Sequence, residues 1–154
     1  MKRGIQFEVP NEWGSHLGEA LKPFNISNFD WYNGGEEAYR LTEGVMEPLF
    51  HGEMYGMKGE DLSKILQSTF SYIIFADFKA YPQGESTKDV LTYEEFLNSQ
   101  CQLIVLVVDS SYVAVYCKDT EMLNLIYQNA VEKRYEKVKY ITNENDTRTK
   151  LSAW

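Results

Sequence analysis

The sequence predicts an α+β fold with a mostly antiparallel mixed sheet and about four helices packed mainly on one face. Three observations carry this prediction. Several segments alternate between polar and apolar residues, as half-buried strands do. Two pairs of such segments are separated by short turn signals, as in antiparallel hairpins. The intervening stretches repeat apolar residues at helical spacing, and the elements follow the order β-α-β-β-α-β-α-β-β-α-β.

The first two elements come from residues 2–22. Residues 2–9 alternate and therefore predict a strand, which Pro10 ends. Residues 11–22 place apolar side chains on one helical face, and Pro23 stops the helix. Glycines within this stretch weaken the helix prediction.

A hairpin is expected next. Residues 26–32 alternate, and Asn33-Gly34-Gly35 is a tight-turn signal because each residue tolerates a positive φ. The partner strand would cover residues 36–41. Residues 43–58 contain several glycines and a proline, so we interpret them as a long, partly packed loop of the kind that carries binding roles.

The remaining elements are predicted with fewer irregularities. Thr92 and Glu95 have the spacing of a helix capping box. Residues 103–108 are apolar throughout, which indicates a central strand covered on both sides. In order, we expect a helix at 60–68, a strand at 70–81, a polar loop at 82–90, a helix at 92–98, strands at 103–108 and 112–117, a helix from 119 or 120 to 134, and a strand at 135–142.

Length and composition fit one domain over residues 1–154, with a polar tail from about residue 143. The net charge of −8 disfavours binding to nucleic acid and to anionic membrane surfaces. The basic pair Lys2-Arg3 has no apolar stretch behind it, so no signal peptide is expected. The longest aliphatic run is far shorter than the roughly 20 residues of a membrane span. A cytoplasmic location is therefore expected.

The sequence offers little cofactor or metal chemistry. No phosphate-binding loop, dinucleotide fingerprint or nucleophile elbow is present, so no cofactor is expected. No Cys-x-x-Cys or helical His pair is present, so no metal site is expected either. Cys101 and Cys117 are expected to be buried, reduced and unable to form a disulfide with each other. We assign no catalytic residue and leave enzymatic activity open, leaning against it.

Asp77 is the most unusual single residue, because it interrupts an apolar and aromatic strand. A carboxylate there must reach water, pair with a cation or have a raised pKa. Lys79 follows on the same face, so the plain interpretation is an exposed ion pair or an edge position. The functional interpretation is a site carboxylate, with Glu94, Glu95 or Arg148 as neighbours.

The segment 31–61 is rich in acidic and aromatic residues, and such a surface would suit a basic protein partner. In the tail, Asp146 and Arg148 belong to a run of hydrogen-bonding groups that could either fold back or form a contact patch. The candidate binding residues are Asp77, Trp31, Tyr32, Glu36, Glu37, Tyr39, Phe50, His51, Tyr55, Asp146 and Arg148.

Short segments along nearly the whole chain resemble a small family from Gram-positive bacteria, of about this length, known only as a domain of unknown function. The resemblance implies a bacterial cytoplasmic protein and supplies no activity or catalytic residue. The segments are Lys2-Arg3-Gly4-Ile5, Pro10-Asn11, Glu47-Pro48-Leu49-Phe50, Phe75-Ala76-Asp77, Tyr116-Cys117-Lys118, Tyr140-Ile141-Thr142, Glu144-Asn145-Asp146 and Arg148-Thr149.

Three functions remain open. The leading hypothesis is a non-enzymatic protein-binding module, in one form an immunity or antitoxin-like protein that masks a basic toxin. The second is a small-molecule enzyme or sensor with a carboxylate site around Asp77. The third is a homo-oligomer that associates through an exposed sheet edge.

Overall fold

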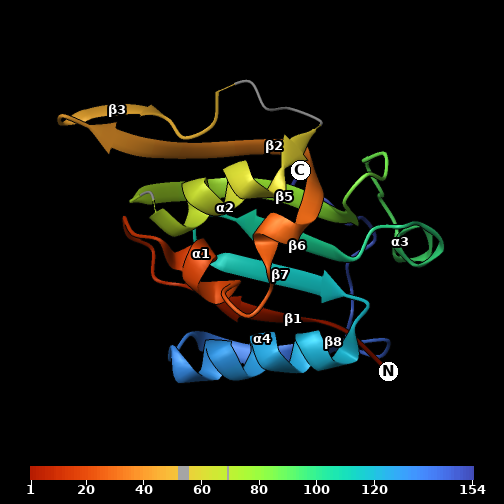
Figure 1. The fold of residues 1–154 in the computed structure, drawn as a ribbon. Helices are drawn as coiled ribbons and strands as arrows, with labels where there is room; N and C mark the ends of the chain where they lie inside the picture. Colours follow the sequence, from red (N-terminus) through yellow and green to blue (C-terminus); the bar gives the residue numbers. More distant parts are fainter. Residues whose placement is uncertain (52–55, 69) are drawn as a thin grey trace.

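An eight-stranded antiparallel sheet organises the chain in the computed structural model, which describes residues 1–51, 56–68 and 70–154 (Figure 1). The strands lie in the order β3-β2-β5-β6-β7-β1-β8, and β4 also pairs with β2. The predicted α+β class is confirmed. The strands are β1 (Lys2–Glu8), β2 (Phe29–Thr42), β3 (Val45–Pro48), β4 (Met57–Lys58), β5 (Ser71–Pro82), β6 (Leu103–Val108), β7 (Tyr112–Cys117) and β8 (Glu136–Thr142).

Three helices cover one face of this sheet: α1 (His16–Ala20), α2 (Gly59–Ser68) and α4 (Thr120–Glu132) (Figure 1). A short 3-10 helix, η1 (Ile26–Asn28), leads into β2. Helix α3 (Tyr93–Asn98) lies on the opposite face. Most helices therefore pack on one face, as predicted. Among the described residues, no helix is long and apolar enough to cross a bilayer.

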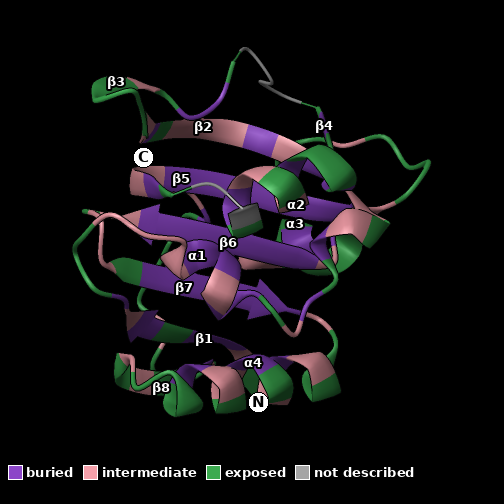
Figure 2. Ribbon diagram, turned by 60° about the vertical axis from the view of Figure 1, so that its left-hand side comes forward, coloured by how far each residue is buried: buried purple, intermediate pink, exposed green. Residues whose placement is uncertain are grey.

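Strand β6 separates two hydrophobic cores, which explains why its sequence is apolar on both faces. Leu103, Val105 and Val107 point into the larger core beneath α1, α2 and α4. Ile104 and Leu106 point into a smaller core on the opposite face. The central strands are accordingly buried along most of their length (Figure 2).

The smaller core is closed by α3 and by the C-terminal segment, residues 143–154, which crosses this face of the sheet after β8. Phe96 of α3 and Leu151 of the C-terminal segment are both buried there. The Leu151 backbone N–H donates to the Leu91 carbonyl oxygen at 2.8 Å. The tail is thus packed against the sheet on this side.

Strand β2 differs from the predicted hairpin. Residues 29–42 form one strand that pairs with β5 on both sides of Asn33-Gly34-Gly35. The register shifts by one residue there, so the glycines form a β-bulge. Gly35 has a φ of 120°, a backbone conformation that favours glycine. The chain nevertheless does not reverse its direction at this point. The prediction of a turn at this point is wrong, because the twelve-residue partner β5 continues past it.

The actual hairpin joins β2 to β3 through Glu43 and Gly44, inside the segment that we expected to be a loop. Both turn residues have positive φ values, 51° and 80°, as a two-residue hairpin turn requires. The prediction of a loop at 43–58 is therefore wrong for β3 and β4, which are short strands.

The helix termini follow the local sequence signals. The Thr92 side-chain oxygen accepts a hydrogen bond from the Glu95 backbone N–H at 3.0 Å, as the capping box predicts. The Glu95 carboxylate accepts from the Leu91 N–H at 2.9 Å, one residue before the expected donor. The Asp119 carboxylate caps α4 by accepting from the Glu121 N–H at 3.0 Å. Helix α1 covers only part of the predicted 11–22.

Candidate functional site around Asp77 and the β2–β3 hairpin

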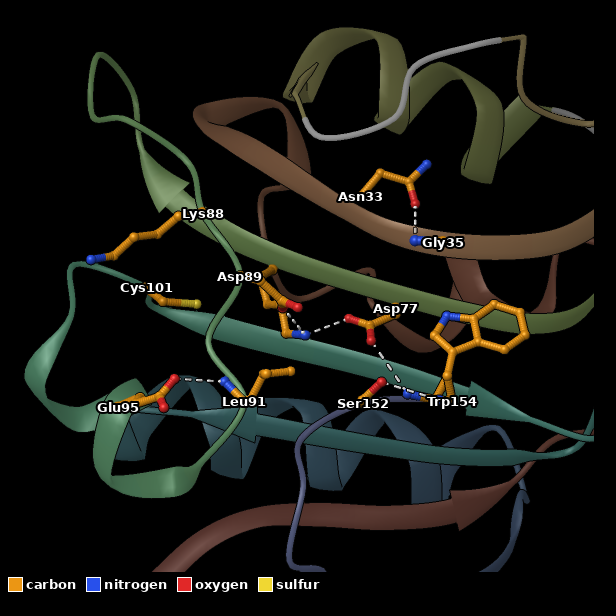
Figure 3. Close-up of polar contacts among 12 residues, drawn as sticks. Asn33, Gly35, Asp77, Lys88, Asp89, Leu91, Glu95, Cys101, Ser152 and Trp154 are labelled. Atoms are coloured by element: carbon orange, nitrogen blue, oxygen red, sulfur yellow. Dashed lines mark hydrogen bonds and ion pairs between the residues drawn. The ribbon is translucent and has the colours of Figure 1, made fainter.

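Asp77 lies on the central strand β5 and forms a buried ion pair with Lys79 (Figure 3). The Lys79 side chain is fully buried, and that of Asp77 is 2% exposed. The Lys79 ammonium donates to Asp77 Oδ1 and to Asp89 Oδ1, both at 2.6 Å. The sequence prediction of the pair is correct, but an exposed or edge position is wrong. The pair lies in the interior because the loop between β5 and α3 covers it and places Asp89 against Lys79.

The C-terminal segment covers the other oxygen of Asp77. The Ala153 backbone N–H donates to Asp77 Oδ2 at 3.3 Å. The Trp154 ring packs against the Phe75 ring, with centroids 5.2 Å apart. These contacts anchor the end of the described chain on β5. The Asp77 carboxylate therefore acts as an attachment point between the sheet and the tail.

The β2 bulge packs against Asp77 from the neighbouring strand. A Cβ atom on Gly34 would lie 2.9 Å from the Asp77 Cγ, so only glycine fits at this distance. Asn33 is fully buried, and its Oδ1 accepts from the Gly35 N–H at 2.9 Å. Among the described residues, the Asn33 side-chain nitrogen has no hydrogen-bond partner.

This closed arrangement gives the Asp77 network a structural role. One ammonium serves two carboxylates, and Asp77 also accepts a backbone hydrogen bond, so its oxygens are occupied within the protein. Of the predicted neighbours, Glu95 is used in capping α3, and Arg148 Nη1 donates to the Ser152 carbonyl oxygen at 3.1 Å. The network can hold the fold together, and a substrate would have to displace the tail to reach it.

The cysteines are buried, and the acidic side chains form no metal-type cluster in the part of the chain that the structure describes. Cys101 and Cys117 are free and buried, and burial raises the pKa values of their thiols to about 12 and about 11. Cys117 lies opposite Leu103 and not opposite Cys101, in agreement with the expectation that the two cysteines do not pair. No cluster of three His, Cys, Asp or Glu side chains suited to a metal ion occurs among these residues.

The proposed acidic and aromatic surface does not assemble as expected, because two of its rings lie in the core. Trp31 is fully buried, and its indole N–H donates to the Ile26 carbonyl oxygen at 3.0 Å. Phe50 is 5% exposed and packs against Phe78, with ring centroids 5.5 Å apart. Exposure of these two rings was wrong. The alternation of β2 directs Trp31 inward, toward the helix-covered face.

The other predicted residues of this segment lie on two sides of the sheet. Tyr32 is half-buried against the smaller core. Tyr39 is half-buried and donates through its hydroxyl to the exposed Glu37 carboxylate at 3.1 Å. Glu36 is half-buried at the bulge, and His51 is exposed with its Nε2 3.2 Å from Arg40 Nη2. Tyr55 lies outside the described residues.

Asp146 and Arg148 belong to the tail where it crosses β7. Asp146 pairs with Arg3 at 3.2 Å, and its oxygens accept from the Tyr116 hydroxyl at 3.2 Å. Burial, with a contribution from the Asp146 carboxylate, raises the pKa of Tyr116 to about 12, and Arg148 opposes this shift. The fold-back interpretation of Asp146 is thus correct. Arg148 is exposed beside it.

The β2–β3 hairpin brings together the most exposed apolar side chains of the predicted region. Leu41, Val45 and Met46 are 49%, 60% and 59% exposed. Leu41 pairs with Met46 and Thr42 with Val45, so apolar side chains appear on both faces of the hairpin. The last β2–β5 pair is at Arg40, and the hairpin extends beyond β5 from there (Figure 1).

The matches to known proteins extend over nearly the whole chain. The family model described as "Protein of unknown function (DUF2691)" matches residues 2–152. The chain belongs to the DUF2691 family. "Uncharacterized protein YncE" of Bacillus subtilis (strain 168) is 41% identical over 155 residues, which cover 99% of this chain and 100% of the relative. No solved structure matches significantly.

In this DUF2691 protein, sequence reasoning missed the apolar hairpin and the contribution of Asp89. The signal for the hairpin was present, because Glu43-Gly44 separates two short alternating segments. The signal at Asn33-Gly34-Gly35 was stronger and led to the wrong turn. Asp89 gave no signal, since a carboxylate in a polar loop is normally solvated.

Proposed function

We propose that this protein is a non-enzymatic, cytoplasmic protein-binding module that docks its partner on the β2–β3 hairpin. The observation that carries the proposal is the exposure of three neighbouring apolar side chains, Leu41, Val45 and Met46, on a protruding sheet edge. Clustered exposed apolar side chains with a polar rim are typical of protein interaction sites. Edge strands in addition offer unpaired backbone groups to a partner strand.

The two edges of the sheet differ in how well they are protected. Strand β8 ends the sheet on one side and carries Glu136, Lys137 and Lys139 together with a bulge. Charged residues and bulges discourage the addition of further strands. Strand β3 ends the other side with exposed Val45 and Met46 and contains no lysine. The β3 edge is therefore the more suitable docking edge.

Charge supports a basic partner. Glu36, Glu37, Glu43 and Glu47 lie on β2, its turn and β3, and Arg40 pairs with Glu47 at 3.4 Å. The chain as a whole has a net charge of −8. Complementary charge accelerates association and selects against acidic partners. An immunity or antitoxin-like role, in which the hairpin masks a basic toxin, is one specific form of the proposal.

The test is affinity purification from native lysate with a matched pair of variants. Val45→Ser with Met46→Ser removes the apolar surface of the hairpin. Leu125→Ser with Val131→Ser removes a similar exposed apolar surface from α4, where the two residues are 48% and 51% exposed. We expect a basic protein to co-purify with the wild type and the α4 variant but not with the hairpin variant.

The purification is repeated at about 0.1 M and 1 M salt, where the Debye lengths are about 10 Å and 3 Å. A charge-complementary complex should be weaker at the higher salt. A partner-free monomer at both salt concentrations contradicts the proposal, as does a partner that the hairpin variant retains fully. Light scattering of the purified chain distinguishes self-association through this edge, which would favour the homo-oligomer instead.

A further inference from the structure

A groove of about 900 Å³ opens on the sheet face opposite α1, α2 and α4, away from the β2–β3 hairpin. It lies between strand β8 and the end of the C-terminal segment. Ligand pockets in proteins commonly enclose about 300–1,000 Å³. Among the residues that line it are Gln6, Glu8, Tyr112, Ala114, Ser152 and Trp154.

The groove exists because the tail covers only part of this face. Toward α3 the sheet is sealed by the smaller core, whereas Gln6 on β1 is exposed. Ala114 on β7 also lines the groove and is the register partner of Gln6. Two exposed rings contribute to the lining, Tyr112 at 54% exposure and Trp154 at 60%. The groove thus offers flat apolar surface with a polar amide beside it.

Its wall is fixed in place by the Asp77 network. The Ala153 N–H donates to the buried Asp77 carboxylate (Figure 3). The Trp154 ring packs against Phe75. Lys79 in turn neutralises Asp77. The aromatic wall is therefore held by the sheet before any ligand arrives, which lowers the cost of ordering a site.

Three cations line this groove, although the protein is acidic overall. They are Lys137, Lys139 and Arg148, and all three are exposed. Lys137 pairs with Glu8 at 3.2 Å. Lys139 forms no ion pair among the described residues. Among the side chains that line the groove, three cations accompany one carboxylate, that of Glu8, so the side-chain charge of the lining is positive.

Arg148 contributes its charge without a carboxylate partner of its own among the described side-chain contacts. Its Nη1 donates to the neutral Ser152 carbonyl oxygen at 3.1 Å. The neighbouring Asp146 accepts from the Arg148 backbone N–H at 3.1 Å, but its charge is paired with Arg3. The guanidinium therefore keeps donors for an anion that enters the groove.

The backbone at the rim supports the same interpretation. The four residues of β8 from Glu136 to Lys139 lie opposite the three residues of β1 from Gln6 to Glu8, so β8 bulges there. Lys137 occupies the bulge with a φ of 52°, an uncommon value for a residue with a side chain. Bulges redirect side chains and are frequent beside functional sites.

From this combination we infer that the groove binds an amphipathic organic anion, with its acidic group at Lys139 and Arg148 and its flat apolar body against Tyr112, Ala114 and Trp154. A carboxylate, sulfonate or phosphate ester supplies the acceptor oxygens that these cations require. The ring surfaces select a flat body over a simple inorganic ion. This site is separate from the docking hairpin and does not depend on the proposed function.

The test uses two dyes that share their rings and differ in charge. Anilinonaphthalene sulfonate is an amphipathic anion, and phenylnaphthylamine is the same ring system without the sulfonate. We expect saturable fluorescence enhancement with one sulfonate dye per chain and weaker binding of the neutral dye. Lys139→Gln and Arg148→Gln should each weaken sulfonate binding about fivefold, as expected for one charge-assisted contact in a partly exposed site.

Two control variants exclude less specific explanations. Lys58→Gln removes an exposed lysine from β4, at the opposite side of the sheet, and should leave dye binding unchanged. Val45→Ser with Met46→Ser should also leave it unchanged, because these exposed apolar side chains lie on β3, outside the groove. Neutral-dye binding should not differ between the wild type and any of the cation variants.

A second measurement uses only the wild-type protein, so it does not depend on folding of the variants. Amide chemical-shift changes on adding the sulfonate dye should be confined to residues 6, 112–114, 137–139 and 148–154. Absence of saturable binding, equal affinity in Lys139→Gln, Arg148→Gln and Lys58→Gln, or shift changes centred on residues 41–46 would each overturn the inference.

Discussion

Replacement of Lys79 by Met should destabilise the protein far more than any other single change to its charged groups. The Lys79 side chain is fully buried and that of Asp77 is 2% exposed. Without the ammonium, the Ala153 N–H is the one donor to Asp77 that remains among the described residues. Removing one partner of a buried ion pair typically costs about 3–5 kcal/mol, because the other charge is left uncompensated.

That cost is a large share of the roughly 5–15 kcal/mol that stabilise a typical domain. With a urea dependence of about 2 kcal/mol per molar, the unfolding midpoint should fall by about 1.5–2.5 M. For a domain of this size, the melting temperature should fall by about 6–20 °C. Urea and thermal unfolding followed by circular dichroism measure both quantities.

Asp89→Asn provides the matched control. Asp89 is bonded to the same ammonium at the same 2.6 Å distance, but its side chain is 35% exposed. Solvent screens a partly exposed charge pair, so this change should cost about 1 kcal/mol or less. The double variant Lys79→Met with Asp77→Leu should recover most of the lost stability, because an apolar pair of similar volume avoids the desolvation of two charges.

The reasoning fails if the free energy of unfolding of Lys79→Met is within about 1 kcal/mol of the wild-type value. It also fails if Asp89→Asn costs as much as Lys79→Met, because burial would then not set the cost. If the double variant is no more stable than Lys79→Met alone, the damage comes from lost packing and not from an uncompensated carboxylate.

Three further predictions concern local packing and burial. Gly18→Ala should destabilise the protein, because the new Cβ would clash with the Leu66 carbonyl oxygen of α2. The urea midpoint should fall, although alanine normally stabilises a helix by about 1 kcal/mol relative to glycine. A rise in the midpoint would contradict the close packing of α1 on α2. Thr92→Ala should cost about 1 kcal/mol by removing the acceptor for the Glu95 N–H, whereas Thr92→Ser should cost much less, again by urea unfolding. Burial raises the pKa of Cys101 to about 12 from 9.0, so the stability gained from its neutral thiol is fully present below about pH 9 and is lost as the pH rises toward 12. At pH 8, a thiol-reactive chromophore should therefore react with Cys101 only after unfolding. Rapid reaction with the native protein would be inconsistent with this burial.

Elements whose signals are local could be predicted from the sequence. The run Leu103 to Val108 required apolar surroundings on both faces, and the structure supplies two cores. Thr92 and Asp119 cap their helices through bonds to residues within three positions. Local hydrogen-bonding chemistry of this kind needs no knowledge of distant segments.

Features that depend on distant segments could not be predicted. Period-two alternation placed Asp77 and Lys79 on one face, but their burial depends on Asp89 and on the tail residue Ala153. Composition alone did not show on which face of the sheet each ring of the acidic segment would lie. Trp31 lies in the larger core because β2 pairs with β5 in a register that directs it there.

The Asn33-Gly34-Gly35 bulge shows why a correct local signal led to the wrong topology. These residues do adopt a turn-like conformation, since Asn33 Oδ1 accepts from the Gly35 N–H and Gly35 has a φ of 120°. Whether such a motif reverses the chain or inserts one extra residue depends on the partner strand. Here β5 is long enough to pair on both sides of the motif.

The bulge also affects both of the proposed binding sites, the docking hairpin and the groove beside β8. One extra residue in β2 shifts the alternation of everything that follows, so Ala38 faces the larger core and the hairpin carries Leu41 and Met46 on one side. The same glycines leave room for the Asp77 carboxylate that holds the tail. A side chain at Gly34 would therefore disturb both the orientation of the docking hairpin and the wall of the anion groove. The position is constrained by two contacts at once, which accounts for glycine in the middle of a fourteen-residue strand.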